Sequence, residues 1–584
     1  MVTRTASAVA LAILWAAGTA SATEGEALYL RHCAGCHHAK RVGLVAPPLL
    51  PGYFSRPAGT WIEGVIANGL PATQMPEFAT TLRASEITAI AAYIQAPAPQ
   101  TDLTWTREDI NESRRDYRAD GGAKLPSSAL EELTLVMEKG ERSLVALDGG
   151  TLEKLASFHV GEVHGGPKFS HSLDTVYAVA RDGLVTRIST TRLASLTQVK
   201  AGISSRALAV SGDDRHVAVA NLLPPGLMLF DSELRPVGEL PLEAAAGGLY
   251  ALPERRQFAL SLRGKAELWL IDDHPPFNVT RRTLPAPFED LSLVPGRPLM
   301  LGAAREGTAI YLYDYEKGMT LASFPASGMP HLASAAFWRR EGELFAGINH
   351  IKKPELIVIS LDSLTMAAVV PLAGAGWFVR SHTATPHSWT GTDSDKIALI
   401  DKADYSRIRY LIPQPGHKAM HIEFCAGGKY ALVSIPEKEG AVAVYDTATL
   451  ELVKSIPFNH PAGKYNASLK TFPARGLSAN RSSAFAGPVA REPDYVPSAS
   501  PMDGMAGRDV YENYCMGCHN IMHEAFGPSF QSIARTRDSG QVRAHVLAPR
   551  ASARALGYRL NSMPYIPLSN EQVTAVVNFV MSAK

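Results

Sequence analysis

IYLYDYEKGMTL, residues 310–321, is an apolar run that ends in an aspartate and then turns, and this arrangement returns throughout the middle of the chain. It recurs as LVALDGGTLEKL, VTRISTTRLASL, LMLFDSELRPVG, LWLIDDHPPFNV, IVISLDSLTMAA, IALIDKADYSRI and VAVYDTATLELV. The polar residues that mark these runs are Asp148, Ser189, Asp231, Asp272, Asp314, Asp362, Asp401 and Asp446, at steps of 41, 42, 41, 42, 48, 39 and 45 residues. Periods of about 40–45 residues with several strands per unit are typical of β-propellers. Eight markers therefore predict eight blades.

The propeller is predicted over residues 127–486, and a smaller helical unit is expected on each side of it. Residues 23–97 close with the helical pattern ASEITAIAAYIQ, and residues 505–584 close with SNEQVTAVVNFVM, where Ser569 would cap the helix. The residues that these two patterns place on apolar faces are Ile87, Ile90, Ala91 and Ile94, and Val573, Val576, Val577 and Val580. Residues 98–126 and 487–504 are predicted linkers, marked by proline-rich stretches. The fold class is mainly β, an eight-bladed β-propeller flanked by two small all-α domains.

Both flanking units contain Cys-x-x-Cys-His, in RHCAGCHHAK (31–40) and YENYCMGCHNI (511–521). Two thiols in this motif attach a c-type haem, and the adjacent histidine is placed to ligate its iron. We therefore predict two covalent haem c groups, with attachment at Cys33, Cys36, Cys515 and Cys518 and iron ligation by His37 and His519. Met75 in LPATQMPEF and Met563 in NSMPYIPLS are the predicted opposite ligands, because a thioether suits an electron carrier. The flanking units are thus predicted to be cytochrome c domains. A zinc or thiol redox site is the alternative for each motif.

Composition and the N-terminus bear on partners and location. The chain has 57 basic and 56 acidic residues and no long run of like charge, so we expect no nucleic-acid partner. Residues 1–22, MVTRTASAVALAILWAAGTASA, have the form of a cleavable signal peptide, and their apolar run is shorter than the roughly 20 residues that span a bilayer. We predict a periplasmic protein. Cys425, the cysteine outside both motifs, is expected to be buried and inert.

Histidine, glycine and cationic residues gather in HVGEVHGGPKFSHSLDTVYAVARDGLV, residues 159–185. His164 precedes two glycines that would let a flat ring approach the backbone, and Lys168 and Arg181 could pair with acid groups on that ring. Taken alone, a histidine placed like His164 is more often a turn histidine than a ligand.

Four motifs resemble the haem d1 domains of cytochrome cd1 nitrite reductases and of their relatives in haem d1 synthesis. They are His164-Gly-Gly-Pro-Lys-Phe-Ser through Arg181-Asp-Gly, MPHLASAAFW with His331, GAGWFVRSHTATPHSW with His382, and HPAGKYNASLK. The resemblance covers about residues 127–475, and GLPATQMPEF and EDINESR look closest to the dihydro-haem d1 dehydrogenase branch. The second cytochrome, at the C-terminus, departs from both branches.

The resemblance implies site residues. His164 would be the proximal ligand of the d1 iron, and His331 and His382 would face the distal side. In the dehydrogenase branch the residue at the place of His331 binds iron, whereas in the reductases two distal histidines protonate nitrite. Arg206, Arg380 and Lys168 are candidates for the carboxylates of the ring, and Tyr465 is a candidate pocket residue.

The function implied is an oxidoreductase that binds haem d1 or its dihydro precursor without a covalent bond and converts a propionate of the precursor to an acrylate. Two c-haems could hold the two electrons of one turnover, and His331 or His382 would take a proton. Periplasmic electron-transfer proteins are the expected partners, with nitrite reductase or other haem d1 maturation proteins as further candidates. Reduction of nitrite to nitric oxide is one alternative, and a non-enzymatic haem d1 carrier is another.

Overall fold

The computed structural model describes residues 24–43, 46–51, 61–69, 75–97, 103–117, 125–477, 507–516, 519, 521–522, 527–549, 552, 556, 563, 566 and 568–583. The chain divides into two compact units, residues 105–495 and the two terminal segments together. The predicted signal peptide lies outside the described residues, as do Cys518 and the predicted linker 487–504. Among the helices of the described part, none has both the length and the apolar character needed to cross a membrane.

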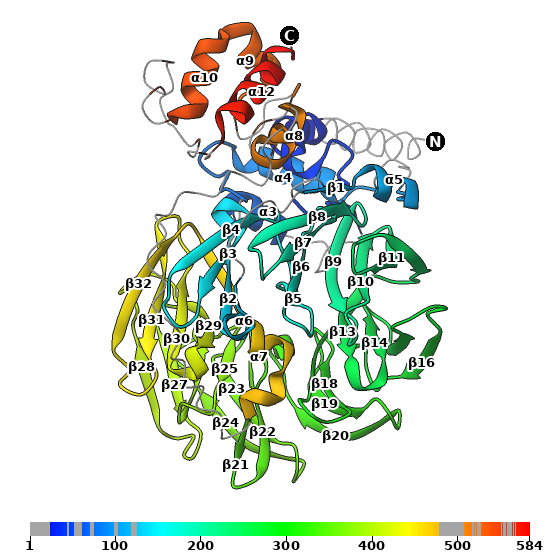
Figure 1. Ribbon diagram of the computed structural model, residues 1–584, viewed down its shortest axis with the longest axis vertical. Helices are drawn as coiled ribbons and strands as arrows, with labels where there is room; N and C mark the ends of the chain where they lie inside the picture. Colours follow the sequence, from blue (N-terminus) through cyan, green and yellow to red (C-terminus); the bar gives the residue numbers. More distant parts are fainter. Residues whose placement is uncertain are drawn as a thin grey trace, which may run out of the picture. The chain divides into compact units, whose positions relative to one another are not determined.

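Eight antiparallel sheets form a closed ring, which confirms the predicted eight-bladed propeller (Figure 1). Four blades, from the inner to the outer strand, are β5 (Lys168–Phe169), β6 (Thr175–Val179), β7 (Leu184–Ser189) and β8 (Ala194–Lys200); β9 (Ser204–Val210), β10 (His216–Leu223), β11 (Pro225–Asp231) and β12 (Pro236–Pro241); β13 (Ala246–Leu252), β14 (Gln257–Leu262), β15 (Glu267–Asp272) and β16 (Val279–Thr283); and β17 (Asp290–Leu293), β18 (Leu299–Ala303), β19 (Ala309–Asp314) and β20 (Met319–Pro325). The other four are β21 (Ala336–Arg340), β22 (Glu343–Asn349), β23 (Glu355–Ser360) and β24 (Thr365–Pro371); β25 (Val379–Ser381), β26 (His387–Gly391), β27 (Ile397–Asp401) and β28 (Ile408–Leu411); β29 (Met420–Cys425), β30 (Tyr430–Ile435), β31 (Gly440–Asp446) and β32 (Leu452–Phe458); and β33 (Pro461–Asn466), β2 (Leu133–Glu138), β3 (Ser143–Asp148) and β4 (Lys154–His159). The last strand, β33, pairs with β2, so strands from the two ends of the propeller close one blade.

The inner strands all run in the same direction along the central axis, because each begins a four-stranded antiparallel blade. We call the end of the axis where the inner strands begin the first mouth, and the end where they finish the second mouth. Turns between second and third strands therefore lie at the first mouth. Turns between first and second strands lie at the second mouth.

The marker residues of the repeat end the third strand of seven blades. The carboxylates of Asp148 and Asp314 each accept two backbone N–H groups of the following turn, at 2.8–3.0 Å. Such side-chain to backbone bonds favour aspartate at a turn. In the remaining blade the third strand ends at Ser360, two residues before Asp362, which explains the irregular steps around that marker.

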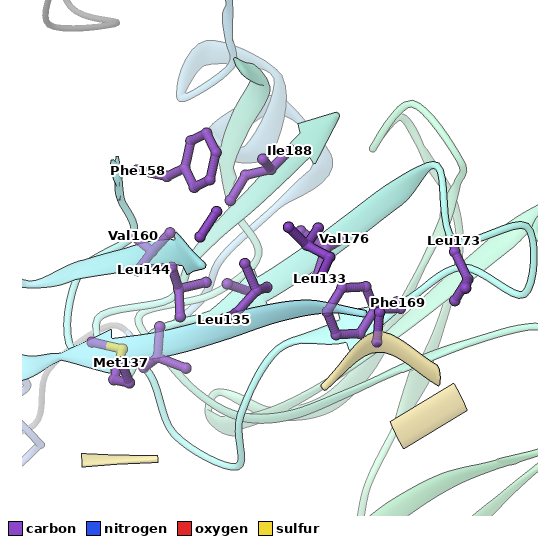
Figure 2. Packing of buried hydrophobic residues seen from close by; sticks show 14 of the residues in the cluster. Leu133, Leu135, Met137, Leu144, Phe158, Val160, Phe169, Leu173, Val176 and Ile188 are labelled. Atoms are coloured by element: carbon purple, nitrogen blue, oxygen red, sulfur yellow. The ribbon is translucent and has the colours of Figure 1, made fainter. Parts of the chain in front are cut away.

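Apolar side chains from neighbouring blades fill the spaces between the sheets. Figure 2 shows one such cluster, in which strands of the blade closed by β33 meet strands of the β5 blade. Its labelled members are Leu133, Leu135, Met137, Leu144, Phe158, Val160, Phe169, Leu173, Val176 and Ile188. Burial of this kind between successive blades, at about 25 cal/mol per Å² of apolar surface, holds the ring together and gives the axis rigid walls.

The segment predicted as the linker 98–126 includes regular structure that attaches to the propeller. Helix α5 (Arg107–Glu112) buries Ile110, and strand β1 (Arg115–Asp116) adds a fifth strand to the blade by pairing with the outer strand β8. The indole N–H of Trp105 also donates to the carbonyl of Lys200. An unpaired outer strand accepts a further strand readily, which is why so short a segment forms one here. A four-residue helix, α6 (Ser127–Leu130), then leads into β2.

The N-terminal module contains helical residues 24–32, α2 (Ala34–His37), α3 (Trp61–Asn68) and α4 (Ala84–Gln95). Its closing helix buries the four predicted apolar residues. The C-terminal module contains α8 (Gly507–Val510), η6 (Tyr511–Cys515), α9 (Phe530–Thr536), α10 (Ser539–Leu547) and α12 (Asn570–Met581). Ser569 caps α12 as predicted, by accepting the backbone N–H of Gln572, and the four valines are buried.

Candidate functional site

The N-terminal module places Cys33, Cys36 and His37 on one helical turn, where the backbone N–H of His37 donates to the carbonyl of Cys33. The Nδ1 atom of His37 lies 2.8 Å from the carbonyl oxygen of Pro47. Because a carbonyl can only accept, Nδ1 carries the proton and Nε2 keeps its lone pair for a metal. Burial lowers the pKa of His37, which keeps the ring neutral. Met75 packs against the same buried cluster as Cys33. These residues fit a c-type haem.

The C-terminal module repeats this arrangement around His519. Its Nδ1 atom lies 2.7 Å from the carbonyl oxygen of Pro528, and its backbone N–H donates to the carbonyl of Cys515. A side chain at Gly527 would place its Cβ 2.4 Å from the imidazole ring, so the Gly-Pro pair both admits and orients the histidine. Met563 is partly buried. The described residues of this motif therefore fit a second c-type haem.

His164 lies at the first mouth of the propeller, between β4 and β5. Its Nδ1 atom is 2.9 Å from the carbonyl oxygen of Arg206, on the neighbouring inner strand β9. Nδ1 is therefore the protonated nitrogen, and Nε2 is left as a possible metal ligand. Burial and the charges of Arg181 and Arg206 hold the pKa of His164 well below its usual value, so the ring is neutral. His164 thus shares the ligand-like arrangement of His37 and His519.

Tyr465 lies directly against the glycine pair that follows His164. A Cβ atom at Gly166 would fall 2.2 Å from the Tyr465 ring, and Gly166 has a φ of +75°. A Cβ at Gly463 would meet the Tyr465 hydroxyl at the same distance. Both glycines are therefore required for the tyrosine to lie where it does. The structure brings Tyr465 close to His164, as the sequence suggested.

His331 also lies at the first mouth, immediately before η3 (Leu332–Ser334), which leads into the inner strand β21. Its Nδ1 atom lies 2.6 Å from the carbonyl oxygen of Trp377, which again leaves Nε2 available. Asp290 on the inner strand β17 accepts the backbone N–H of Ala333 at 2.8 Å and so fixes the turn that presents His331.

His421 was not identified from the sequence, but it lies between Phe378 and Tyr465, two aromatic residues of the candidate site. It is 3% exposed, and its imidazole lies 4.6 Å from the Phe378 ring and 5.7 Å from the Tyr465 ring, measured between centroids. Phe378 in turn lies 5.6 Å from His331. The Nδ1 atom of His421 accepts the backbone N–H of Lys464 at 3.2 Å, so Nε2 carries the proton and can donate. Burial and the charge of Lys464 hold the pKa of His421 well below the usual value.

His382 is not brought together with His331. It follows the inner strand β25, so it lies at the second mouth, whereas His331 precedes an inner strand and lies at the first. Its ring lies beside Gly428 and 5.6 Å from Phe424, and its Nδ1 accepts the backbone N–H of Ala384. Burial and Lys402 lower the pKa of His382 to about 4. His331 and His382 therefore lie at opposite ends of their inner strands, and that both face one side of the ring stays a prediction.

Cationic side chains surround the axis. Arg181, Arg263 and Arg305 each follow the second strand of a blade within two residues, which places all three at the first mouth. Burial, followed by the charges of these three residues, lowers the pKa of Arg206 on β9 to about 9. Further along the axis, Lys464 and Lys470 lie near Glu423, itself 1% exposed. Arg380 lies near both lysines, and Lys168 lies near Lys470. A flat ligand with several carboxylates fits this excess of largely half-buried positive charge.

Comparison with known proteins gives the family. The family model described as "Cytochrome D1 heme domain" matches residues 128–470. The chain belongs to the cytochrome D1 heme domain family. In addition to this domain, "Cytochrome C oxidase, cbb3-type, subunit III" matches residues 20–94, and "Cytochrome c" matches residues 504–584. The residues that surround His164 and His331 thus lie within the D1 heme domain, and both Cys-x-x-Cys-His motifs lie within cytochrome models.

Individual relatives of the D1 heme domain family are also similar over long stretches. A dihydro-heme d1 dehydrogenase of Pseudomonas aeruginosa is 37% identical over 485 residues, which cover 80% of this chain and 98% of that protein. Protein NirF of the same organism is 27% identical and covers 57% of this chain and 90% of that one. The solved structure of the dihydro-heme d1 dehydrogenase NirN in complex with DHE superposes with a TM-score of 0.68 at 36% identity, covering 77% of this chain and all of that chain. The resemblance noted in the sequence is confirmed.

Proposed function

We propose that this protein dehydrogenates a dihydro-haem d1 precursor in haem d1 biosynthesis and passes the electrons to its own two c-haems. The observation that carries the proposal is the neutral His164, whose Nε2 is left available inside a ring of cationic side chains. The similarity of 80% of the chain to a dihydro-heme d1 dehydrogenase, and of 77% to the structure of such an enzyme with DHE, supports the choice of substrate.

The reaction requires two one-electron acceptors. A propionate side chain, –CH2–CH2–COO⁻, becomes an acrylate, –CH=CH–COO⁻, and releases two electrons and two protons. Each bound c-haem supplies a site for one electron when its iron is ferric. Cys33, Cys36 and His37 would hold one haem, and Cys515, Cys518 and His519 the other, so one chain could collect both electrons of a turnover.

Residues of the propeller would bind and orient the substrate. His164 would ligate the iron from one side, and His331, whose Nε2 is also available, would ligate it from the other or take a proton. His421 and Tyr465 would line the same edge of the ring, where His421 offers an N–H to the substrate. Arg206, Arg380 and Lys168 would pair with the substrate carboxylates.

Nitrite reduction is the less favoured reading. That reaction is expected to use two distal histidines, and His382, the second of the predicted pair, lies at the second mouth and away from His331. A passive haem d1 carrier would have no use for two redox centres on its own chain.

We propose the periplasm as the site of action. The signal-like residues 1–22 and two haem c motifs support this location, since the sequence has the form of an exported protein. Soluble electron-transfer proteins would then reoxidise the c-haems, and proteins that use or mature haem d1 would receive the product.

Incubation of the oxidised protein with dihydro-haem d1 under anaerobic conditions tests the proposal. The extracted tetrapyrrole should be two hydrogen atoms lighter by mass spectrometry. Recovery of unchanged precursor from protein that binds it and carries both c-haems would refute the dehydrogenase assignment.

A further inference from the structure

The chain crosses the second mouth of the propeller after its last strand. Helix α7 (Ala467–Thr471) and η5 (Pro473–Leu477) form this segment, which we call the crossbar, and Figure 1 shows α7 in front of the ring. Leu469 packs against the cluster shared by the β25 and β29 blades, Phe472 against the cluster of Figure 2, and Leu477 against the cluster shared by the β17 and β21 blades. The crossbar is thus tied to three separate sectors of the ring.

Three further contacts fix the crossbar, two near its start and one in η5. The side chain of Asn466 accepts the backbone N–H of Leu469, which caps α7. The backbone N–H of Ser468 donates to the carbonyl of Glu131, and the guanidinium of Arg475 lies 3.0 Å from the carboxylate of the same residue. A helix held in this way presents its side chains in a defined direction.

Lys470 on the crossbar points back to the axis. Its ammonium lies 2.8 Å from the carboxylate of Glu423 on the inner strand β29 and 5.8 Å from the centre of the Tyr465 ring. The Glu423 side chain is 2% exposed and the Lys470 side chain 25% exposed. Lys470 is therefore a cation of the site that the crossbar contributes, whereas Lys168, Arg380 and Lys464 come from inner strands.

Glu423 cannot balance the charge around it. Lys464 and Lys470 both lie near this one carboxylate, whose side chain is 2% exposed. Arg380 lies near both lysines, and Lys168 lies near Lys470. Lys464 is fully buried and donates to the hydroxyl of Ser434 and to the carbonyl of His421. Buried charges that lack partners are costly, so this group of cations favours entry of an additional anion.

We propose that Lys470 binds the carboxylate of the substrate side chain that lies beside Tyr465 and His421, and that Glu423 holds Lys470 until that carboxylate arrives. This rests on the proposed function, since it assigns one carboxylate of the tetrapyrrole to one edge of the site. Lys470 is a positioning residue: it holds the side chain whose carbon atoms face Tyr465 and His421, while Glu423 competes with the substrate for the same ammonium.

The inference predicts that substitutions at Lys470 and at Glu423 change the affinity for haem d1 in opposite directions. Haem d1 is titrated into the full-length protein with both c-haems attached, and binding is followed by difference absorption spectra. Lys470→Met should weaken binding roughly ten- to a hundredfold, because a charge-assisted hydrogen bond is lost, whereas Lys470→Arg should stay within about threefold of the wild type. Glu423→Gln should tighten binding severalfold, because the competing carboxylate is gone. Lys352→Met, which removes an exposed cation paired with Glu306, is the matched control and should leave binding unchanged.

Haem d1 whose carboxylates are methylated shows whether the weaker binding of Lys470→Met comes from loss of a contact with a substrate carboxylate. Lys470→Met should have no effect on the affinity for this ester. For variants of low stability, the increase in the thermal unfolding midpoint on addition of haem d1 gives a second measurement. Compared with the wild type, this increase should be larger in Glu423→Gln and smaller in Lys470→Met.

Weaker binding in both Glu423→Gln and Lys470→Met would overturn the inference, because the pair would then only hold the crossbar in place. An unchanged affinity in Lys470→Met would also overturn it and would leave the proposed function intact. If the wild-type protein binds neither haem d1 nor dihydro-haem d1, the proposed function itself fails.

Discussion

The Nδ1 atom of His164 is bound to the carbonyl oxygen of Arg206 at 2.9 Å, and this bond fixes the tautomer of the propeller histidine. A histidine that donates from Nδ1 to a backbone carbonyl presents an unprotonated Nε2, which is how metal-binding histidines are commonly held. The bond therefore suits His164 to the role proposed for it, ligation of a tetrapyrrole iron.

Replacement of His164 by alanine should weaken haem d1 binding more than about tenfold, because an iron ligand is lost, while both c-haem spectra persist. Spectral titration with haem d1 measures the effect. His274→Ala, at a half-exposed histidine that pairs with Asp273, is the control and should bind as the wild type does. Equal affinity of His164→Ala and wild type would remove His164 from the site.

Gly166→Ala should displace Tyr465, because the new Cβ would lie 2.2 Å from its ring. We expect a loss of about 1–3 kcal/mol in the free energy of unfolding together with weaker haem d1 binding. Gly416 has a similar φ, +77°, and nothing lies within 4 Å of the position that a Cβ would take there, so Gly416→Ala reproduces the backbone strain alone. Equal behaviour of the two variants in denaturation and in haem d1 titration would show that the contact with Tyr465 is unimportant.

Two c-haems per chain follow from the two motifs. The mass of the purified protein should exceed that of the processed polypeptide by two haem groups. The double variant Cys515→Ala and Cys518→Ala should carry one haem and accept one electron per chain in a single turnover with the precursor. Two electrons accepted by this variant would mean that the C-terminal haem is not an acceptor.

Haem d1 affinity should depend on pH through Lys470. Burial and the charge of Arg380 lower the pKa of Lys470 to about 8 in the folded protein. A bound carboxylate stabilises the ammonium form, so binding above pH 8 requires uptake of a proton, and the Kd should rise by up to about tenfold per pH unit above that value. Below pH 8 this contribution should be constant. Titrations between pH 7 and pH 10 test this, and Lys470→Met should lose this part of the dependence.

The propeller could be predicted because each blade uses the same type of turn, and that turn favours a particular residue at a fixed position. Aspartates such as Asp148 and Asp314 hold the same turn in successive blades, so they recur at nearly constant spacing. The fifth strand β1 could not be predicted, since a two-residue strand has no pattern of its own and forms only where the outer strand β8 is available.

The site was partly predictable. His164 and Tyr465 were identified from motifs, and the structure brings them together across Gly166. His421 could not be identified from the sequence, because a single histidine at the start of an apolar strand has no motif around it. Its place in the site depends on contacts with Tyr465 and Phe378, which come from other blades. The separation of His382 from His331 depends on strand direction, which the motifs do not carry.

Anaerobic mixing of the oxidised protein with dihydro-haem d1, with no added electron donor, tests the central claim most directly. Stopped-flow absorption at the c-haem bands should show reduction of up to two haems per substrate molecule, because the electrons leave the propionate for the two cytochrome modules. If the precursor reduces neither c-haem, while nitrite rapidly oxidises pre-reduced protein loaded with haem d1, electrons flow in the opposite direction and the protein is a nitrite reductase.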